Sequence, residues 1–333
     1  MLVCYEFPGK KLVDALVRVA NGRCRHHADR YVWRQRLAGQ LSRTFMHLNI
    51  VGVGPQRTGT TWLYECLREH PQLCFPRDVK ETSFFDERFN RGWPWYWSHF
   101  QHRRDRQLCA EVAATYFDVP EAAQRIRDHN PRCRVIISLR DPVARCFSLY
   151  LHHRKRGRLN GSFRDAIERM PRLIDSSRYR AHVSRWRDYF SADQILIVLL
   201  DDISSCPETV LEQTYQFIGI DKAPVPKKAR EQINVASLPA SRALATLATH
   251  GAHWFRDRRL YGPIELAKKL GLKRIYSGFQ RPLPALDSEM RRHLVEELSP
   301  DIAYVEEILG RALPHWRSSQ ARFPGEFESR VRS

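Results

Sequence analysis

The most informative stretch of this 333-residue sequence is IVGVGPQRTGTTW, residues 50–62. A predicted buried strand runs into a short polar loop, and a predicted helix follows the loop. Gly54 and Gly59 are separated by four residues, which is the frame of a phosphate-binding loop between a strand and a helix. Such a loop directs backbone N–H groups and a helix N-terminus at phosphate oxygens. We therefore expect an anion site here, with a glycine-rich turn that binds nothing as the alternative.

The cation of this loop stands in an unusual place. Nucleotide-hydrolysing loops carry Lys and then Ser or Thr after the second glycine, whereas this sequence has Thr60 and Thr61 there and Arg57 inside the loop. The missing lysine and the magnesium-binding hydroxyl serve the β- and γ-phosphates of a nucleoside triphosphate. The loop therefore predicts a site for one phosphate and argues against hydrolysis of ATP or GTP.

Short apolar strands alternate with helical patterns from residue 48 onward. Strands are predicted at residues 48–53, 73–75, 108–112, 134–139 and 195–200. Helices are predicted at residues 60–69, 120–129, 142–156, 178–190, 207–218, 287–298 and 300–309. Ser299 is the expected cap of the last helix, with Pro300 in its first turn. This alternation predicts an α/β fold of the P-loop type, a three-layer α/β/α arrangement with a central, mostly parallel sheet and a helical C-terminal end.

Three segments are expected along the chain: a basic extension over residues 1–48, one domain over 49–316 and a tail over 317–333. The extension carries nine Lys and Arg residues against three acidic ones, and a short helix is predicted at 10–20. It would pack on the domain or make peripheral contact with an anionic membrane surface. The longest apolar run has six residues, far from the ~20 of a membrane-spanning helix. The N-terminus lacks the uninterrupted apolar core after a basic start that a secretory signal has, so we expect a cytoplasmic protein.

Composition narrows the class of partner. The 55 Lys and Arg residues exceed the 37 Asp and Glu residues and give a net charge of +18, which favours anionic partners. The eight cysteines form no C-x-x-C pair and no cluster with zinc-ligand spacing. We therefore predict free thiols in a reducing compartment and no metal site.

A second motif, RDPVARCFS, follows the fourth predicted strand and begins at Arg140. It places a cation at the carboxyl end of the strand and the hydroxyl of Ser148 two turns into the next helix. If that helix starts near Pro142, Ser148 can face an anion held by Arg140, with charge-assisted hydrogen bonds. A local ion pair between Asp141 and Arg145 is expected beside them.

Together the two motifs resemble those of the sulfotransferases that use 3′-phosphoadenosine 5′-phosphosulfate (PAPS), in particular bacterial-type and heparan-sulfotransferase-like members. The family patterns are G-x-x-[KR]-x-G-T-T and R-D-P-x-x-R-x-x-S-x-Y. The resemblance implies that the 5′-phosphosulfate is held by Arg57, Thr58, Gly59, Thr60 and Thr61. It also implies that Arg140 and Ser148 bind the 3′-phosphate and that Trp62 lies on the adenine. Taken by itself, Trp62 is equally typical of a helix face in the core.

A third motif, KETSFF, begins at Lys80 and is similar to the K-E-x-H-F-F segment of the same family. The resemblance implies that Glu81 is the catalytic base, that Lys80 assists the sulfuryl oxygens and that Arg57 neutralises charge on the leaving oxygen. The alternative is a solvated ion pair beside core aromatics. The sequence departs from the family pattern at Ser83, which replaces the usual histidine, and at Val112. Because heparan-type members have a lysine at the position of Val112, this second departure weakens a heparan-type acceptor.

The predicted function is transfer of the sulfuryl group from PAPS to a hydroxyl or amine, without a metal. The acceptor would be a glycan, a lipid or a small metabolite, and the charge of the chain favours an anionic one. Two alternatives come from other classes: a P-loop kinase-like phosphotransferase and a non-enzymatic, basic nucleic-acid-binding protein. We do not expect nucleic acid as a partner, because the sequence contains no recognised binding motif.

Overall fold

The computed structural model describes residues 46–231 and 284–318, and all statements below concern this part of the chain. Its centre is a sheet of five parallel strands in the order β2-β3-β1-β4-β5. The strands are β1 (Leu48–Val53), β2 (Leu73–Cys74), β3 (Leu108–Val112), β4 (Arg134–Leu139) and β5 (Ile195–Leu199). The predicted α/β fold with a parallel sheet is therefore confirmed.

Strand order determines where a ligand site lies. The chain passes from β1 outward to β2 and back to β3, and then crosses to β4 on the other side of β1. In open α/β sheets, ligands bind outside the carboxyl ends of the strands at such a change of direction. The segments that follow β1 and β4 therefore lie next to each other, although about 80 residues separate them in the sequence.

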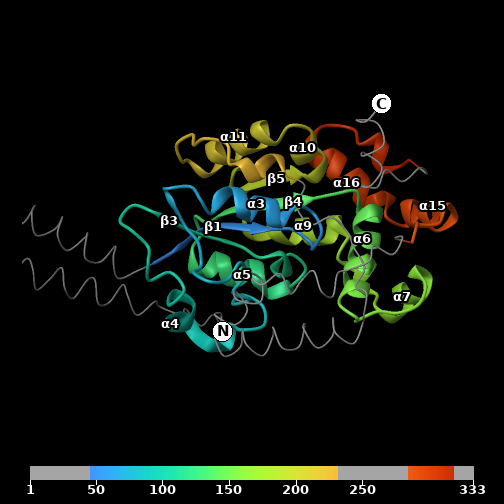
Figure 1. The fold of residues 1–333 in the computed structure, drawn as a ribbon, viewed down its shortest axis with the longest axis horizontal. Helices are drawn as coiled ribbons and strands as arrows, with labels where there is room; N and C mark the ends of the chain where they lie inside the picture. Colours follow the sequence, from blue (N-terminus) through green and yellow to red (C-terminus); the bar gives the residue numbers. More distant parts are fainter. Residues whose placement is uncertain (1–45, 232–283, 319–333) are drawn as a thin grey trace, which may run out of the picture. The chain divides into compact units, whose positions relative to one another are not determined.

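Helices cover both faces of the sheet. Figure 1 shows α3 (Thr60–Leu67) and α11 (Pro207–Ile218) on one side, and α5 (Pro120–His129) and α9 (Tyr179–Tyr189) on the other. Helix α6 (Pro142–Lys155) follows β4. The C-terminal helices are α15 (Ser288–Glu297) and α16 (Ser299–Leu309). They attach to this body through the ion pair of Arg178 with Glu297, with an N···O distance of 2.6 Å, and through apolar contacts of α15 with α6.

The predicted strands and helices are confirmed with shifts of one or two residues at their ends. Four short helices escaped prediction because four to seven residues are too few to show a helical period. They are α4 (Gly92–Trp97), α7 (Phe163–Arg169), α8 (Arg172–Asp175) and α10 (Leu200–Ser205). The capping role of Ser299 was wrong, because Ser299 is the first residue of α16 and its Oγ accepts a hydrogen bond from Arg317. The helix predicted at 10–20 lies outside the described residues.

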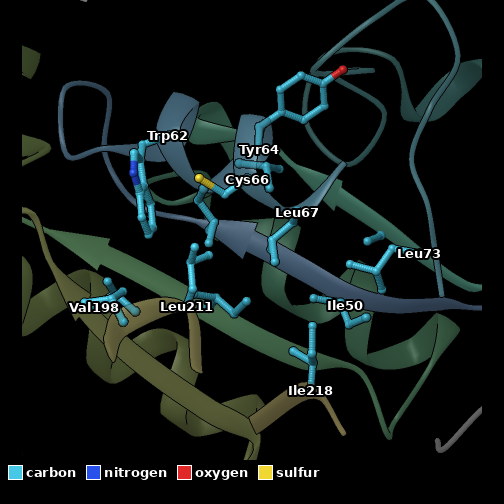
Figure 2. Packing of buried hydrophobic residues seen from close by; sticks show 14 of the residues in the cluster. Ile50, Trp62, Tyr64, Cys66, Leu67, Leu73, Val198, Leu211 and Ile218 are labelled. Carbon is cyan, nitrogen blue, oxygen red and sulfur yellow. The ribbon is translucent and has the colours of Figure 1, made fainter. Parts of the chain in front are cut away.

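One apolar cluster fixes α3 to the sheet. Figure 2 shows Trp62, Cys66 and Leu67 of α3 directed toward Ile50 of β1 and Leu211 of α11. All five side chains are at most 4% exposed. Because each large apolar side chain contributes roughly 1.5–3 kcal/mol when buried, this packing holds the start of α3 in a fixed place beside the loop that precedes it. None of the helices in the described ranges is long and apolar enough to span a bilayer.

Candidate active site

The loop after β1 is shaped by its two glycines. Gly54 has φ 136°, and a Cβ there would lie 2.3 Å from the carbonyl oxygen of Ser138 on β4, so the loop runs directly against β4. Gly59, with φ 97°, is the N-cap residue of α3 and has no side chain to occupy the first N–H groups of the helix. Those N–H groups and the helix dipole favour an anion at this position. The Thr58 hydroxyl is buried and hydrogen-bonds to Ser138 Oγ (2.8 Å) and the Pro55 carbonyl (2.8 Å), which fixes the loop from inside.

Three residues predicted from two separate motifs meet at this loop. Arg57 Nε donates a hydrogen bond to Ser148 Oγ at 3.0 Å, and Arg140 Nη1 lies 3.5 Å from the carbonyl oxygen of Arg57. Arg140 is only 8% exposed, and the buried hydroxyl of Tyr179 donates to its carbonyl oxygen at 2.8 Å. The meeting follows from the strand order, because β1 and β4 are neighbours and both segments leave the sheet at its carboxyl edge.

The site carries an excess of positive charge. Burial, together with the nearby charges of Arg140 and Arg156, lowers the pKa of Arg57 to about 10. Burial also lowers the pKa of Arg140, although Asp141 acts in the opposite sense. His152 lies one helical turn after Ser148, and burial together with Arg156 and Arg57 lowers its pKa to about 3. An anion bound between Arg57 and Arg140 would relieve the mutual repulsion of the two guanidinium groups.

The third motif lies at the same end of α3. Lys80 Nζ donates to Glu81 Oε1 at 2.8 Å and to Thr60 Oγ1 at 3.3 Å, so the pair sits beside the first residue of the helix. The side chain of Glu81 is 27% exposed and can therefore be reached by a molecule from solvent. Thr61 lies half-buried in the same helical turn. The structure thus brings the loop and the Lys80–Glu81 pair together, as the sequence motifs predict.

Comparison with known proteins identifies the family. The family model of the sulfotransferase domain matches residues 49–251, which is more than half of the chain. The chain belongs to the sulfotransferase family. A human bifunctional heparan sulfate N-deacetylase/N-sulfotransferase 3 is 27% identical over 288 residues, which covers 79% of this chain and 30% of the relative. A mouse bifunctional heparan sulfate N-deacetylase/N-sulfotransferase 4 is 30% identical over 189 residues, which covers 50% of this chain and 22% of the relative. This sulfotransferase therefore spans less than a third of either relative.

A solved sulfotransferase from Alicyclobacillus acidocaldarius has the same fold. It superposes with a TM-score of 0.60 at 23% sequence identity, over 82% of this chain and 99% of that one. This likeness supports the fold alone. Family membership rests on the match to the sulfotransferase domain, and it confirms the resemblance seen in the sequence motifs.

The expected ion pair between Asp141 and Arg145 of the sulfotransferase was wrong. Asp141 caps α6 and also pairs with Arg291 of α15 at 2.9 Å, because its carboxylate faces the first N–H groups of the helix and the C-terminal helix beyond them. Arg145 is fully buried and donates instead to Ser176 Oγ at 2.9 Å and to the Leu173 carbonyl at 2.7 Å. Arg291, which sequence reasoning missed, thus attaches the C-terminal helices to the residue beside Arg140.

Trp62 lies in the core of the sulfotransferase. Its ring is 4% exposed in the cluster of Figure 2, and its Nε1 donates to the carbonyl oxygen of Ala229 at 2.9 Å. Ala229 belongs to a short 3-10 turn, Lys227–Arg230. The contacts of Trp62 in the described residues support packing in the core. Contact of its ring with adenine stays a prediction.

Glu111 and His99 are the alternative candidates for a base in place of Glu81. Glu111 is fully buried, and burial raises the pKa of its carboxyl to about 7 even though Thr82, Tyr96 and Tyr116 donate hydrogen bonds to it. His99 is 6% exposed, and its Nδ1 lies 3.1 Å from the carbonyl oxygens of its neighbours. Neither is as accessible to an acceptor as Glu81.

Proposed function

We propose that this sulfotransferase transfers the sulfuryl group of PAPS to a hydroxyl or amine of an acceptor molecule. The observation that carries the proposal is the convergence of Arg57, Arg140 and Ser148, with hydrogen bonds among them, beside the N-terminus of α3. Two cationic side chains and a hydroxyl next to a glycine loop suit a ligand with two separate phosphate groups. PAPS, when bound, supplies the activated sulfuryl group and leaves as adenosine 3′,5′-bisphosphate.

The described residues fit such a ligand. We assign the 3′-phosphate to Arg140 and Ser148, and the 5′-phosphate to Arg57 and the backbone N–H groups of residues 57–61. The lowered pKa of Arg57, which burial and the charges of Arg140 and Arg156 produce, supports this assignment because phosphate charge would offset their repulsion. The side chain of Thr58 is committed to the loop, so its part would be a backbone N–H.

Catalysis would depend on position and charge more than on covalent chemistry. Glu81 accepts the proton of the acceptor hydroxyl or amine as the acceptor atom bonds to sulfur and the bond from sulfur to the 5′-phosphate oxygen breaks. Arg57 stabilises the negative charge that grows on that leaving oxygen. Lys80 would assist the sulfuryl oxygens, a role supported by its hydrogen bonds to Glu81 and Thr60.

The acceptor is proposed only as a class. A glycan fits the relatives named for heparan sulfate N-sulfotransferase activity, whereas Val112 departs from the lysine of heparan-type members. Lipids and small metabolites therefore stay in the proposal. A screen with labelled PAPS against N-desulfated heparan sulfate, a glycolipid and p-nitrophenol samples each class. The domain bounds 49–316, the cytoplasmic location and the membrane contact of the N-terminal extension stay predictions of the sequence.

Phosphotransfer and nucleic-acid binding are not favoured. The loop has no lysine after Gly59, which a kinase of this type needs for the β- and γ-phosphates. The membership in the sulfotransferase family accounts for the loop without either activity.

The nucleotide specificity can be tested by thermal stability. Adenosine 3′,5′-bisphosphate at a concentration far above its Kd should raise the melting temperature by several degrees, because a ligand that binds only the folded state stabilises it. Adenosine 5′-monophosphate at the same concentration should raise it much less, since it lacks the phosphate assigned to Arg140 and Ser148. No shift with the bisphosphate would contradict the proposed function.

The metal requirement can be tested by chelation. The loop lacks the lysine and metal arrangement of triphosphate-hydrolysing enzymes, and the transferred sulfuryl group carries little charge. Turnover with labelled PAPS should therefore stay within about twofold of its original value after EDTA treatment, as the metal-free mechanism predicts. Complete loss of turnover, restored by magnesium, would support the kinase-like alternative.

A further inference from the structure

The carboxyl group of Glu111 accepts hydrogen bonds from several buried donors. It is fully buried near the carboxyl end of β3, opposite Val51 of β1 in the sheet. Its Oε1 accepts from the Thr82 N–H and the Thr82 hydroxyl, both at 2.7 Å, and from the Tyr116 hydroxyl at 3.1 Å. Its Oε2 accepts from the Tyr96 hydroxyl at 3.0 Å. Four donors converge on this buried carboxyl group and hold it firmly, because hydrogen bonds are stronger in the low-dielectric interior than in water.

Two of the four donors, the N–H and the hydroxyl of Thr82, lie in the segment that carries Glu81. Residues 80–83 belong to no helix or strand, and Ser83 has the unusual φ of 55°. The backbone N–H of Thr82, next to Glu81, donates to Glu111, and the N–H of Phe84 lies 2.9 Å from the Tyr116 hydroxyl. An irregular segment without ladder hydrogen bonds takes its position from such side-chain partners.

The partner on the sheet side is rigid. Strand β3 is hydrogen-bonded on one side to β1 and on the other to β2, so Glu111 cannot move without the sheet. The hydrogen bonds from Thr82 to Glu111 therefore hold Thr82, and with it the preceding residues Lys80 and Glu81, at a fixed position relative to the sheet. Strand β1 runs into the loop that holds Arg57. The Arg57 loop and the Lys80–Glu81 segment are therefore both held by the paired strands β1 and β3.

We propose that Glu111 is a positioning residue for the reaction, which holds Thr82 so that Glu81 stays beside Thr60 at the start of α3. The proposal rests on the proposed function of Glu81 as the base. Glu111 itself is fully buried, so its part in the reaction would be indirect. Its effect follows from geometry, since a misplacement of about 1 Å at a reacting group can cost on the order of 10²-fold in rate.

A matched pair of variants separates positioning from stability. Thr82→Val and Tyr96→Phe each remove one hydroxyl that donates to the same carboxylate. Thr82 lies in the segment of Glu81. Tyr96 belongs to α4, and its hydroxyl donates to the other carboxyl oxygen of Glu111, Oε2. The phenyl ring of the Tyr96→Phe variant would keep the stacking of Tyr96 on Phe84, where the ring centroids are 4.6 Å apart. Thr82→Val should lower the melting temperature somewhat more than Tyr96→Phe, because the Thr82 hydroxyl also accepts from the Phe84 N–H at 3.2 Å and lies 3.1 Å from the Tyr116 hydroxyl.

The kinetic expectation differs between the two. With the acceptor that the labelled-PAPS screen identifies, Thr82→Val should lower kcat about tenfold, because the base is less well placed. Tyr96→Phe should keep kcat within about twofold, and both should bind adenosine 3′,5′-bisphosphate like the unmodified protein. Equal kcat values in the two variants, whether both unchanged or both reduced, would overturn the positioning role.

A second readout does not depend on turnover. Hydrogen–deuterium exchange of a peptide that spans residues 80–84 should be faster in Thr82→Val than in Tyr96→Phe, because only the first loosens this segment. Equal exchange in both variants would overturn the proposal. If the unmodified protein transfers no sulfuryl group to any acceptor, the proposed function fails, and the exchange experiment still decides whether Glu111 holds this segment.

Discussion

Replacement of Glu81 by glutamine is expected to lower turnover by about 10²- to 10⁴-fold while the affinity for adenosine 3′,5′-bisphosphate stays nearly unchanged. Glutamine keeps the shape of the side chain and an oxygen that can accept the hydrogen bond from Lys80, whose Nζ lies 2.8 Å from Glu81 Oε1. It removes the ability to take a proton and, with it, the negative charge that pairs with Lys80. Turnover at saturating acceptor and a titration with the bisphosphate measure the two quantities separately.

The structure supplies the reason why stability should hardly change. The Lys80–Glu81 pair is partly exposed, with 22% and 27% of the two side chains accessible. Such a pair contributes only about 0–1 kcal/mol to folding. Glu87→Gln is the matched control, since Glu87 is an exposed glutamate six positions along the same segment. Its turnover should equal that of the unmodified protein.

Two results would argue against this role of Glu81. Turnover near the original value in Glu81→Gln, with the acceptor at saturation, would exclude it as the base. A parallel loss of bisphosphate affinity would mean that the substitution disturbs the loop at Thr60, which Lys80 also contacts at 3.3 Å. The first result would direct attention to another group as the base.

Arg140→Gln is expected to weaken binding of adenosine 3′,5′-bisphosphate by about 10- to 100-fold, because a charge-assisted hydrogen bond contributes roughly 1.5–3 kcal/mol. Binding of adenosine 5′-monophosphate should change little, since this nucleotide lacks the phosphate assigned to Arg140. The discrimination between the two nucleotides should therefore largely disappear. Isothermal titration of each nucleotide into the variant measures both affinities.

The position of Arg140 makes a control necessary. Arg140 is 8% exposed and also contacts the carbonyl oxygen of Arg57 at 3.5 Å, so its replacement could shift the loop. A shifted loop would weaken both nucleotides equally, and that outcome would contradict the assignment of Arg140 to the 3′-phosphate. Arg164→Gln, on the exposed side of α7, removes one positive charge elsewhere and should leave both affinities unchanged.

Much of the fold could be predicted because its signals are local. Each strand is a short apolar run, and each longer helix has a periodic apolar face, so β1, β3 and β4 begin and end where the sequence predicts. The motifs of the candidate site are contiguous as well. Parallel strands place their carboxyl ends at one edge of the sheet, and this places the loop of Arg57 and the segment of Arg140 at that edge.

Contacts between distant segments could not be predicted in the same way. Arg57 donates to Ser148 from 91 positions away, and Asp141 pairs with Arg291 across 150 positions. Nothing in the local sequence around Asp141 indicates Arg291, so the nearby Arg145 was the natural but wrong expectation. The packing of Trp62 against Ala229, 167 positions away, belongs to the same class.

The sequence by itself thus determined the phosphate-type loop, the alternation of strands and helices, and the residue types that an anion site needs. Only the tertiary structure decided which of these residues meet, and it added the hydrogen bonds of Glu111 to Thr82, the residue next to Glu81. The physical reason is that hydrophobic periodicity specifies an element and its buried face, whereas the neighbours of that face depend on the strand order β2-β3-β1-β4-β5. That order is set by the packing of all the elements at once.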